Sequence, residues 1–96
     1  MAMSVMFSYE AEKALFEIGT WVEERNTAGA GIRFIDRFID RIEAFAVHGA
    51  TYSICNHLTL AQKGLRCVQI DDWVVAFHQT KERFDVRYII HASGLS

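Results

Sequence analysis

The sequence predicts an α+β fold in which an N-terminal strand and an antiparallel two-helix hairpin pack on a sheet of three to four antiparallel strands. Two observations support this prediction. Apolar residues recur at helical spacing along two stretches of the first half of the chain, and from Leu65 onward they recur at every second position. A chain of 96 residues suits one domain, which we expect to span residues 1–96.

The composition is that of a chain that folds and presents apolar surface. Hydrophobic residues make up 51% and charged residues 23%, so the chain has enough apolar residues to form a core. The apolar runs fall short of the roughly 18 residues that span a bilayer, so we expect no membrane association. With a net charge of −2 and no basic block, we expect no direct nucleic-acid binding that depends on phosphate contacts.

The first half contains the strand and the two helices. Residues 2–7 are predicted to form a short strand, followed by Ser8 as the N-cap of a helix that runs to about Arg25. After a break at residues 26–27, where Thr27 offers a cap, a second amphipathic helix is predicted to begin within residues 28–31. It is predicted to end at Gly49 in the position that follows the helix C-cap.

The second half is predicted to hold a loop and a three-stranded meander. Residues 49–64 lack a clear period, so we expect a loop with room for one short turn of helix or strand. Strands are predicted over residues 66–70, 73–79 and 84–91, because β-branched and aromatic residues dominate there. The short turns between them predict that these residues face one another across the strands: Ile70 and Trp73, Val68 and Val75, Gln79 and Phe84, Phe77 and Val86.

Strict alternation then assigns each side chain to one face of the sheet. The helices are predicted to cover Val68, Ile70, Trp73, Val75, Phe77, Phe84, Val86, Tyr88 and Ile90. The opposite face mixes apolar and ionisable groups, which suits a groove covered by a partner. From this face we predict these partner-binding residues: Leu65, Val74, Ala76, His78, Asp85, Arg87 and Ile89. His91 falls on the same face.

His78 and Asp85 are predicted to stand opposite each other, which is an arrangement that can orient an imidazole for proton transfer. The same pair is also an ordinary cross-strand stabiliser, and we favour that interpretation. We expect Cys55 and Cys67 to be reduced thiols of a cytoplasmic protein. Cysteine and histidine spacing matches no closed zinc site, so we expect no metal and no cofactor.

The order of these segments resembles the RelE/ParE superfamily of bacterial toxins from type II toxin–antitoxin, or plasmid stabilization, modules. The resemblance covers nearly the whole chain. It is carried by Ser8-Tyr9-Glu10-Ala11-Glu12, Phe34-Ile35-Asp36-Arg37-Phe38-Ile39-Asp40-Arg41-Ile42, Lys63-Gly64-Leu65-Arg66, Trp73-Val74-Val75-Ala76-Phe77 and Val86-Arg87-Tyr88-Ile89-Ile90-His91.

The resemblance implies two different activities. RelE-like members are ribosome-dependent ribonucleases that use cations on the open sheet face, where this chain has Cys67, Gln69 and Val74. ParE-like members bind DNA gyrase and share the Gly-Leu-Arg turn and the final histidine, so the chain is closer to them. They commonly carry an arginine after that histidine, where this chain has Ala92-Ser93-Gly94, which leaves open whether toxicity is retained.

The leading hypothesis is therefore a ParE-like toxin that acts by binding DNA gyrase and is neutralised by a cognate antitoxin. A homodimer or a heterotetramer with the antitoxin is compatible with the resemblance. The alternative is a messenger ribonuclease that uses Arg66, Arg87 and His91. A third hypothesis is a toxin fold without toxic activity that serves as an interaction module.

Overall fold

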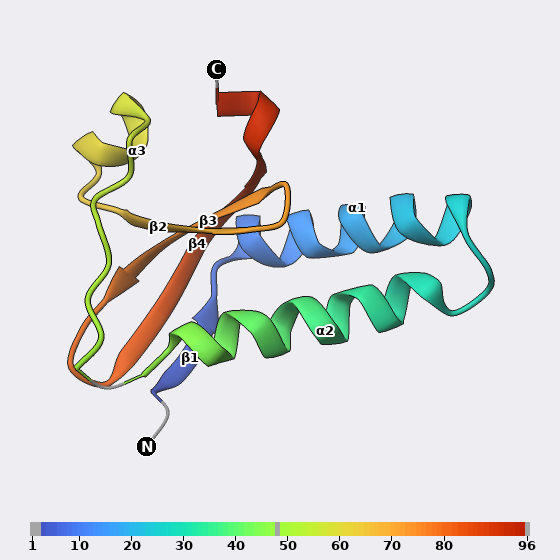
Figure 1. The fold of residues 1–96 in the computed structure, drawn as a ribbon, viewed down its shortest axis with the longest axis horizontal. Coiled ribbons are helices and arrows are strands. Elements are labelled where there is room, and N and C mark those ends of the chain that lie inside the picture. Colours follow the sequence, from blue (N-terminus) through green and yellow to red (C-terminus); the bar gives the residue numbers. More distant parts are fainter. Residues whose placement is uncertain (1–2, 48, 96) are drawn as a thin grey trace.

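The computed structural model describes residues 3–47 and 49–95. Its strands form one sheet in the order β1-β4-β3-β2, and a hairpin of helices α1 and α2 packs against one side of that sheet (Figure 1). The turn between the two helices projects well beyond the sheet. The predicted α+β fold is thus confirmed, with one parallel pair in an otherwise antiparallel sheet.

Strand β1 (Ser4–Phe7) leads directly into the first helix. It pairs in parallel with β4, with Val5 opposite Phe84, and it confirms the predicted strand over residues 4–7. Met3 precedes the strand, and residue 2 lies outside the described residues. Ser8 is the N-cap of α1 (Tyr9–Arg25), as predicted: its Oγ accepts a hydrogen bond from the Ala11 amide at 3.1 Å. This bond satisfies one of the amide groups that every helix leaves unpaired at its start.

Helices α1 and α2 (Ala30–Phe45) cross at two glycines. A Cβ atom on Gly31 would lie 2.3 Å from the carbonyl oxygen of Gly19, so the two backbones touch directly. One turn further along α1, the Glu23 carboxylate accepts hydrogen bonds from the amides of Gly29 and Gly31, each at 2.8 Å. These two bonds hold the pKa of Glu23 below its ordinary value.

Two details at the ends of α2 differ from the prediction. Its N-cap is Gly29 in the left-handed conformation, and Glu23 of the neighbouring helix replaces the expected Thr27 cap. The helix ends at Phe45 instead of continuing to Gly49. The physical reason is the contact with the start of the chain: the Met3 amide donates to the Ala46 carbonyl at 2.9 Å, and Ala46 is fully buried there.

The meander consists of β2 (Arg66–Ile70), β3 (Trp73–Gln79) and β4 (Arg83–His91). All four predicted cross-strand pairs are confirmed. Beyond them, however, β4 contains a bulge, because Phe77 faces Val86 while its neighbour Ala76 faces Tyr88. Arg87 is therefore the extra residue on β4.

This bulge reverses the predicted faces of the last strand residues. Ile89 packs in the main core with the helices, whereas Tyr88 and Ile90 pack on the other side of the sheet. His91 also moves to the helix-covered side, where its ring meets that of Trp73 edge-on at 5.0 Å between centroids. Strict alternation was wrong from Tyr88 onward, since the additional residue Arg87 shifts every later side chain to the opposite face.

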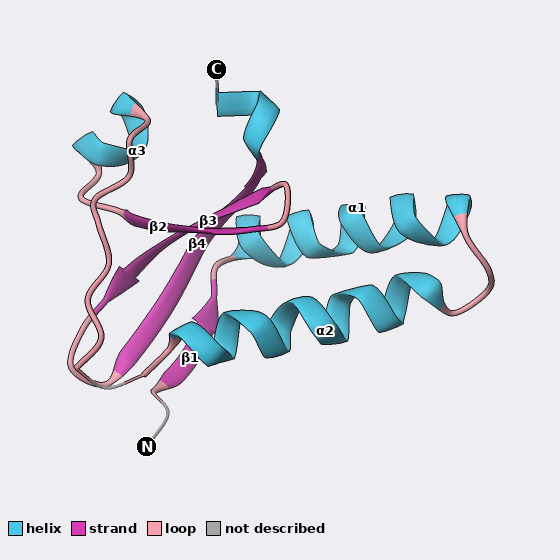
Figure 2. Cartoon of the chain, in the orientation of Figure 1, coloured by secondary structure: helices cyan, strands magenta, loops and turns pink. Residues whose placement is uncertain are grey.

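The segment between α2 and β2 covers part of the open face. Figure 2 shows it as a long loop that ends in the short helix α3 (Leu58–Gln62). Buried Leu60 and Leu65 pack there against Ala76 and Cys55 in a second, small core. A disulfide joins Cys55 to Cys67 with 4.9 Å between their Cα atoms, so the prediction of two reduced thiols was wrong.

The chain finishes with a short 3₁₀ helix at Ala92–Leu95. Its start is fixed to the β2–β3 turn, since the Ala92 amide donates to the Asp72 carbonyl at 2.7 Å. Within residues 3–47 and 49–95, the helices are all too short or too polar to cross a bilayer.

Candidate functional site

A small polar pocket of about 290 Å³ lies on the open side of the sheet, and we call it the cationic pocket. Its cations are Lys63, which follows α3, and Arg87, which is the bulge residue of β4. Glu10 at the start of α1 is the only carboxylate among its described lining residues. Among the described residues, the lining comprises Glu10, Lys63, Leu65, His78, Arg87 and Tyr88.

Two features of the chain place Arg87 in this pocket. The bulge frees Arg87 from the regular pairing, and Ser8 then fixes the backbone around it. The Ser8 amide donates to the Val86 carbonyl at 2.9 Å, and the Ser8 hydroxyl donates to the Arg87 carbonyl at 2.6 Å. The residue that caps α1 therefore also holds the bulge that carries the cation.

His78 reaches the same pocket from β3, next to the Gly-Leu-Arg turn. A Cβ atom added to Gly64, whose φ is +73°, would lie 4.0 Å from the imidazole Cε1 of His78. Asp85 stands opposite His78, as predicted, but its carboxylate pairs with Arg83 at 3.3 Å. Within the described chain, no hydrogen bond joins His78 and Asp85, so this geometry is that of a hairpin with a neighbouring ion pair.

The structure does not bring Arg66, Arg87 and His91 together. The Arg66 guanidinium donates to the carbonyl of Tyr52 on the helix-covered side of the sheet. The His91 ring meets that of Trp73 edge-on, and its Nδ1 lies 2.7 Å from the hydroxyl of Ser93. Of the three residues, Arg87 alone lines the cationic pocket.

The predicted partner-binding residues fall into two groups. Leu65, Ala76 and Ile89 are buried within the chain itself, the first two beneath α3 and its loop and the third beneath the helices. Their side chains are therefore not at the surface. The other four have exposed or half-buried side chains: Val74, His78, Asp85 and Arg87. Whether these four contact a partner stays a prediction.

Sequence reasoning missed Lys63, Glu10 and Tyr88 as members of the pocket. Lys63 follows a helix whose packing the sequence did not reveal. Tyr88 was assigned to the wrong face because of the bulge. The one available signal was the run Tyr88-Ile89-Ile90. Because these three consecutive residues are all apolar, the apolar–polar pattern does not indicate which of them face the core.

Comparison with known proteins agrees with the fold. A family model described as "ParE toxin of type II toxin-antitoxin system, parDE" matches residues 5–95. A solved structure titled "Chromosomal ParDE TA system from P. aeruginosa" superposes with a TM-score of 0.73 at 10% sequence identity, over 94% of this chain and 96% of that chain. At this identity, the superposition shows similarity of fold. No curated protein matches the chain.

Proposed function

Since the chain belongs to the ParE toxin family of type II toxin–antitoxin systems, we propose that it inhibits DNA gyrase by binding and that a cognate antitoxin neutralises it. The match over residues 5–95 carries this proposal. We place the protein in the bacterial cytoplasm, where gyrase and its DNA substrate are found.

The composition of the open face supports binding over catalysis. The central positions on this face are Cys67, Gln69 and Val74, none of which can supply a positive charge, and Cys67 is held in a disulfide. Stabilising the charge that develops when an RNA backbone is cut requires several converging donors or cations. The face instead offers mixed apolar and polar surface of the kind that proteins recognise.

A supercoiling assay with purified full-length protein and purified gyrase tests the proposal. We expect supercoiling to stop at molar ratios near one toxin per gyrase subunit, and we expect the purified antitoxin to restore it. Full supercoiling at a large molar excess of the protein would contradict gyrase inhibition.

One observation favours a messenger ribonuclease as the second candidate. Lys63 and Arg87 converge beside His78 and Tyr88, so the cationic pocket contains the residue types that bind a phosphate and transfer a proton. Primer extension on translated messenger RNA tests this candidate. It requires ribosome-dependent cuts that Arg87→Ala removes and that the exposed control Lys81→Ala leaves in place.

The third hypothesis, an interaction module without toxicity, is tested in cells. Induced expression without the antitoxin is expected to stop growth if either toxin activity is present. Normal growth, together with a stable antitoxin complex, would instead favour the inactive module.

A further inference from the structure

The disulfide between Cys55 and Cys67 closes a short segment over the open side of the sheet. We call residues 53–65 the strap; they include α3 and lie at the opposite end of the molecule from the α1–α2 turn (Figure 1). Next to the disulfide, the Cys55 amide donates to the Leu65 carbonyl at 3.0 Å, and the Cys67 amide donates to the Ser53 carbonyl at 3.3 Å. The strap is therefore tied at its two ends.

Between these ends the strap is weakly attached to the rest of the molecule. Within the described chain, the hydrogen bonds of residues 56–64 all end within residues 57–65, so none of them reaches the sheet. Leu60 alone among residues 56–64 is buried, and it packs with Ala76 in the small second core. The Nδ1 atom of His57 is buried without a hydrogen-bond partner, which disfavours the closed position. Closure therefore depends on a small apolar contact and on the disulfide.

The closed strap completes the cationic pocket. Lys63, at the end of α3, supplies one of the two cations among its described lining residues. A Cβ atom on the next residue, Gly64, would lie 4.0 Å from Cε1 of His78, so the strap also covers one side of that imidazole. Arg87 belongs to β4 and stays in place when the strap moves. Opening of the strap would therefore remove one cation from the pocket and uncover His78.

We propose that the Cys55–Cys67 pair is a reversible redox switch that closes the strap when oxidised and releases it when reduced, and that thereby sets the charge of the cationic pocket. The inference rests on the proposed function only for the cytoplasmic location, where the few disulfides that form are usually transient or redox-sensing. Cross-linking residues 12 positions apart restricts the open chain enough to favour closure by about a hundredfold.

The chemistry of the switch is thiol–disulfide exchange with a small thiol such as glutathione. Cys67 is half-buried and Cys55 is buried, so the Cys67 sulfur is the accessible one. A glutathione thiolate attacks it, the bond between the two cysteines breaks, and Cys55 leaves as a thiolate that takes up a proton. A second glutathione thiolate then attacks the mixed disulfide and forms glutathione disulfide, and the Cys67 thiolate is released and protonated. Two electrons pass from the two glutathiones to the cysteine pair, and excess glutathione disulfide reverses the reaction.

NMR of the full-length protein in oxidising and reducing glutathione buffers tests the switch. The amides of Lys63 and Leu65 both donate to the Leu60 carbonyl in the closed strap. On reduction we expect these two amides to exchange with solvent about a hundredfold faster, because the open strap is that much more populated. We also expect the Cε1–H signal of His78 to shift, since Gly64 moves away from it. The Cys55→Ser/Cys67→Ser variant should resemble the reduced form in both buffers.

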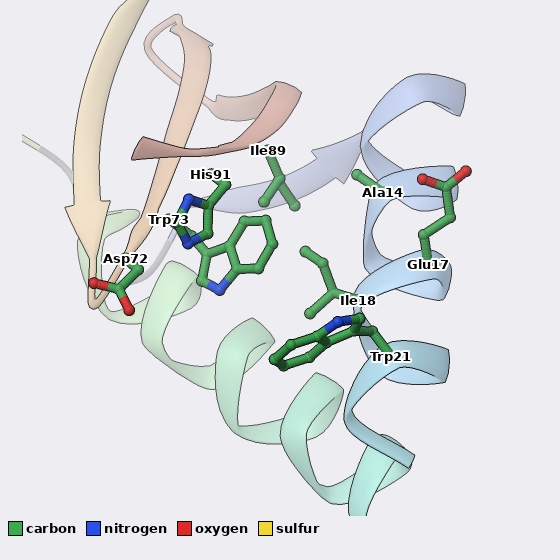
Figure 3. Close-up of a pocket in the computed structure, with 8 residues that line it drawn as sticks. All are labelled: Ala14, Glu17, Ile18, Trp21, Asp72, Trp73, Ile89 and His91. Atoms are coloured by element: carbon green, nitrogen blue, oxygen red, sulfur yellow. The ribbon is translucent and has the colours of Figure 1, made fainter. Parts of the chain in front are cut away.

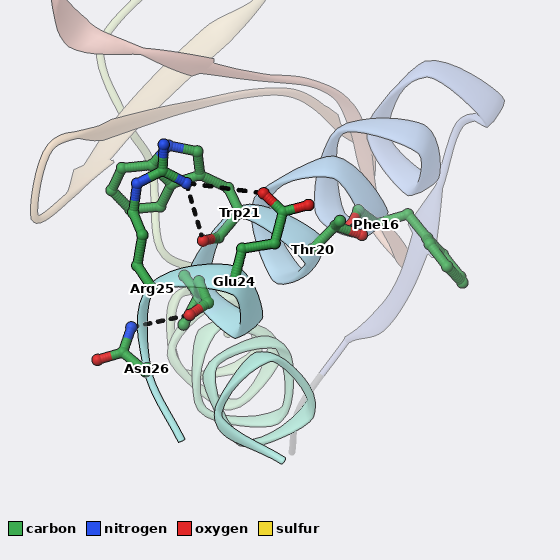
Figure 4. Close-up of polar contacts among 7 residues, drawn as sticks. Phe16, Thr20, Trp21, Glu24, Arg25 and Asn26 are labelled. Atoms are coloured by element: carbon green, nitrogen blue, oxygen red, sulfur yellow. Dashed lines mark hydrogen bonds and ion pairs between the residues drawn. The ribbon is translucent and has the colours of Figure 1, made fainter. Parts of the chain in front are cut away.

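The other end of the molecule provides internal controls. Figure 3 shows His91 and Trp73 beside Trp21, on the side of the sheet that faces α1. Figure 4 shows the Arg25 guanidinium over the Trp21 ring, at 4.3 Å from its centroid. We expect the His91 signal and the tryptophan fluorescence to be the same in both buffers, because release of the strap leaves this region intact.

Three outcomes would overturn the switch. They are a disulfide that stays intact in excess reduced glutathione, strap and His78 signals that are equal in the two states, and a loss of the His91 signal together with those of the strap. The last would show that the disulfide holds the whole fold. Because these readouts do not involve gyrase, a chain that switches but leaves supercoiling unaffected in both states would refute the proposed function alone.

Discussion

Replacing Gly31 by alanine tests the direct backbone contact between the helices of the hairpin. The new Cβ would lie 2.3 Å from the Gly19 carbonyl oxygen and 3.1 Å from its carbon. A backbone carbonyl cannot rotate away, so α1 and α2 must separate. Overpacking of this kind typically costs about 1–3 kcal/mol, and the separation also lengthens the bond from the Gly31 amide to Glu23.

Gly19→Ala is the matched control on the partner helix. Its Cβ would lie 2.5 Å from Cδ1 of Ile35, which is the end of a flexible side chain, so rotation of that side chain relieves the contact. Alanine in the middle of a helix is about 1 kcal/mol more favourable than glycine. We therefore expect Gly19→Ala to change stability by less than about 1 kcal/mol in either direction.

Urea denaturation followed by circular dichroism measures the free energy of unfolding of both variants. In a parallel thermal scan, a loss of about 2 kcal/mol appears as a fall of about 8–16 °C in Tm for a domain of this size. We expect that loss for Gly31→Ala and a near-parental midpoint for Gly19→Ala. If both variants unfolded at the same urea concentration, the inference that the backbones touch at Gly31 would be refuted.

Three further predictions concern bonds that join distant parts of the chain. Glu23→Gln should destabilise the hairpin at neutral pH, because it removes the carboxylate that accepts from the Gly31 and Gly29 amides. In the parent, the pKa of Glu23 is lowered by folding, so its contribution to stability is present above the unfolded pKa and is lost as pH falls through the folded pKa; thermal unfolding as a function of pH measures this. Reducing the Cys55–Cys67 disulfide, which has a sequence separation of 12, should cost about 3 kcal/mol in urea unfolding, and the Cys55→Ser/Cys67→Ser variant should respond no further to reductant. Ser8→Ala should lower the free energy of unfolding by about 1–2 kcal/mol, which thermal unfolding detects as a lower Tm. The exposed control Ser53→Ala should leave the Tm unchanged.

The parts of the fold that sequence predicted are those set by local rules. Ser8 is a good N-cap followed by a helical apolar stripe, and both the cap and the helix were predicted from these signals. The two-residue turn at residues 71–72 fixed the pairing of Ile70 with Trp73. Each of these signals lies within a few residues of the feature it predicts.

The parts that sequence missed depend on contacts between distant residues. The end of α2 is set by Met3, more than forty positions away. The parallel pairing of β1 with β4 brings together the two ends of the chain. The disulfide depends on the path of a loop that has no period, so the spacing of Cys55 and Cys67 alone did not reveal it.

The bulge at Arg87 decides which side of the sheet each later side chain of β4 lies on. With regular pairing, Arg87 would face Ala76, and Ile89 and His91 would lie on the open side. The extra residue keeps Arg87 on the open side, in the cationic pocket, and turns Ile89 and His91 to the helix-covered side. Ile89 is buried there in the main core, and the exposed His91 ring lies beside Trp73. A single bulge therefore places Tyr88 beside Arg87 in the cationic pocket and turns Ile89 into the core beneath the helices. Because the Ser8 hydroxyl caps α1 and also donates to the Arg87 carbonyl, loss of that hydroxyl would disturb the start of the helix and the bulge at once.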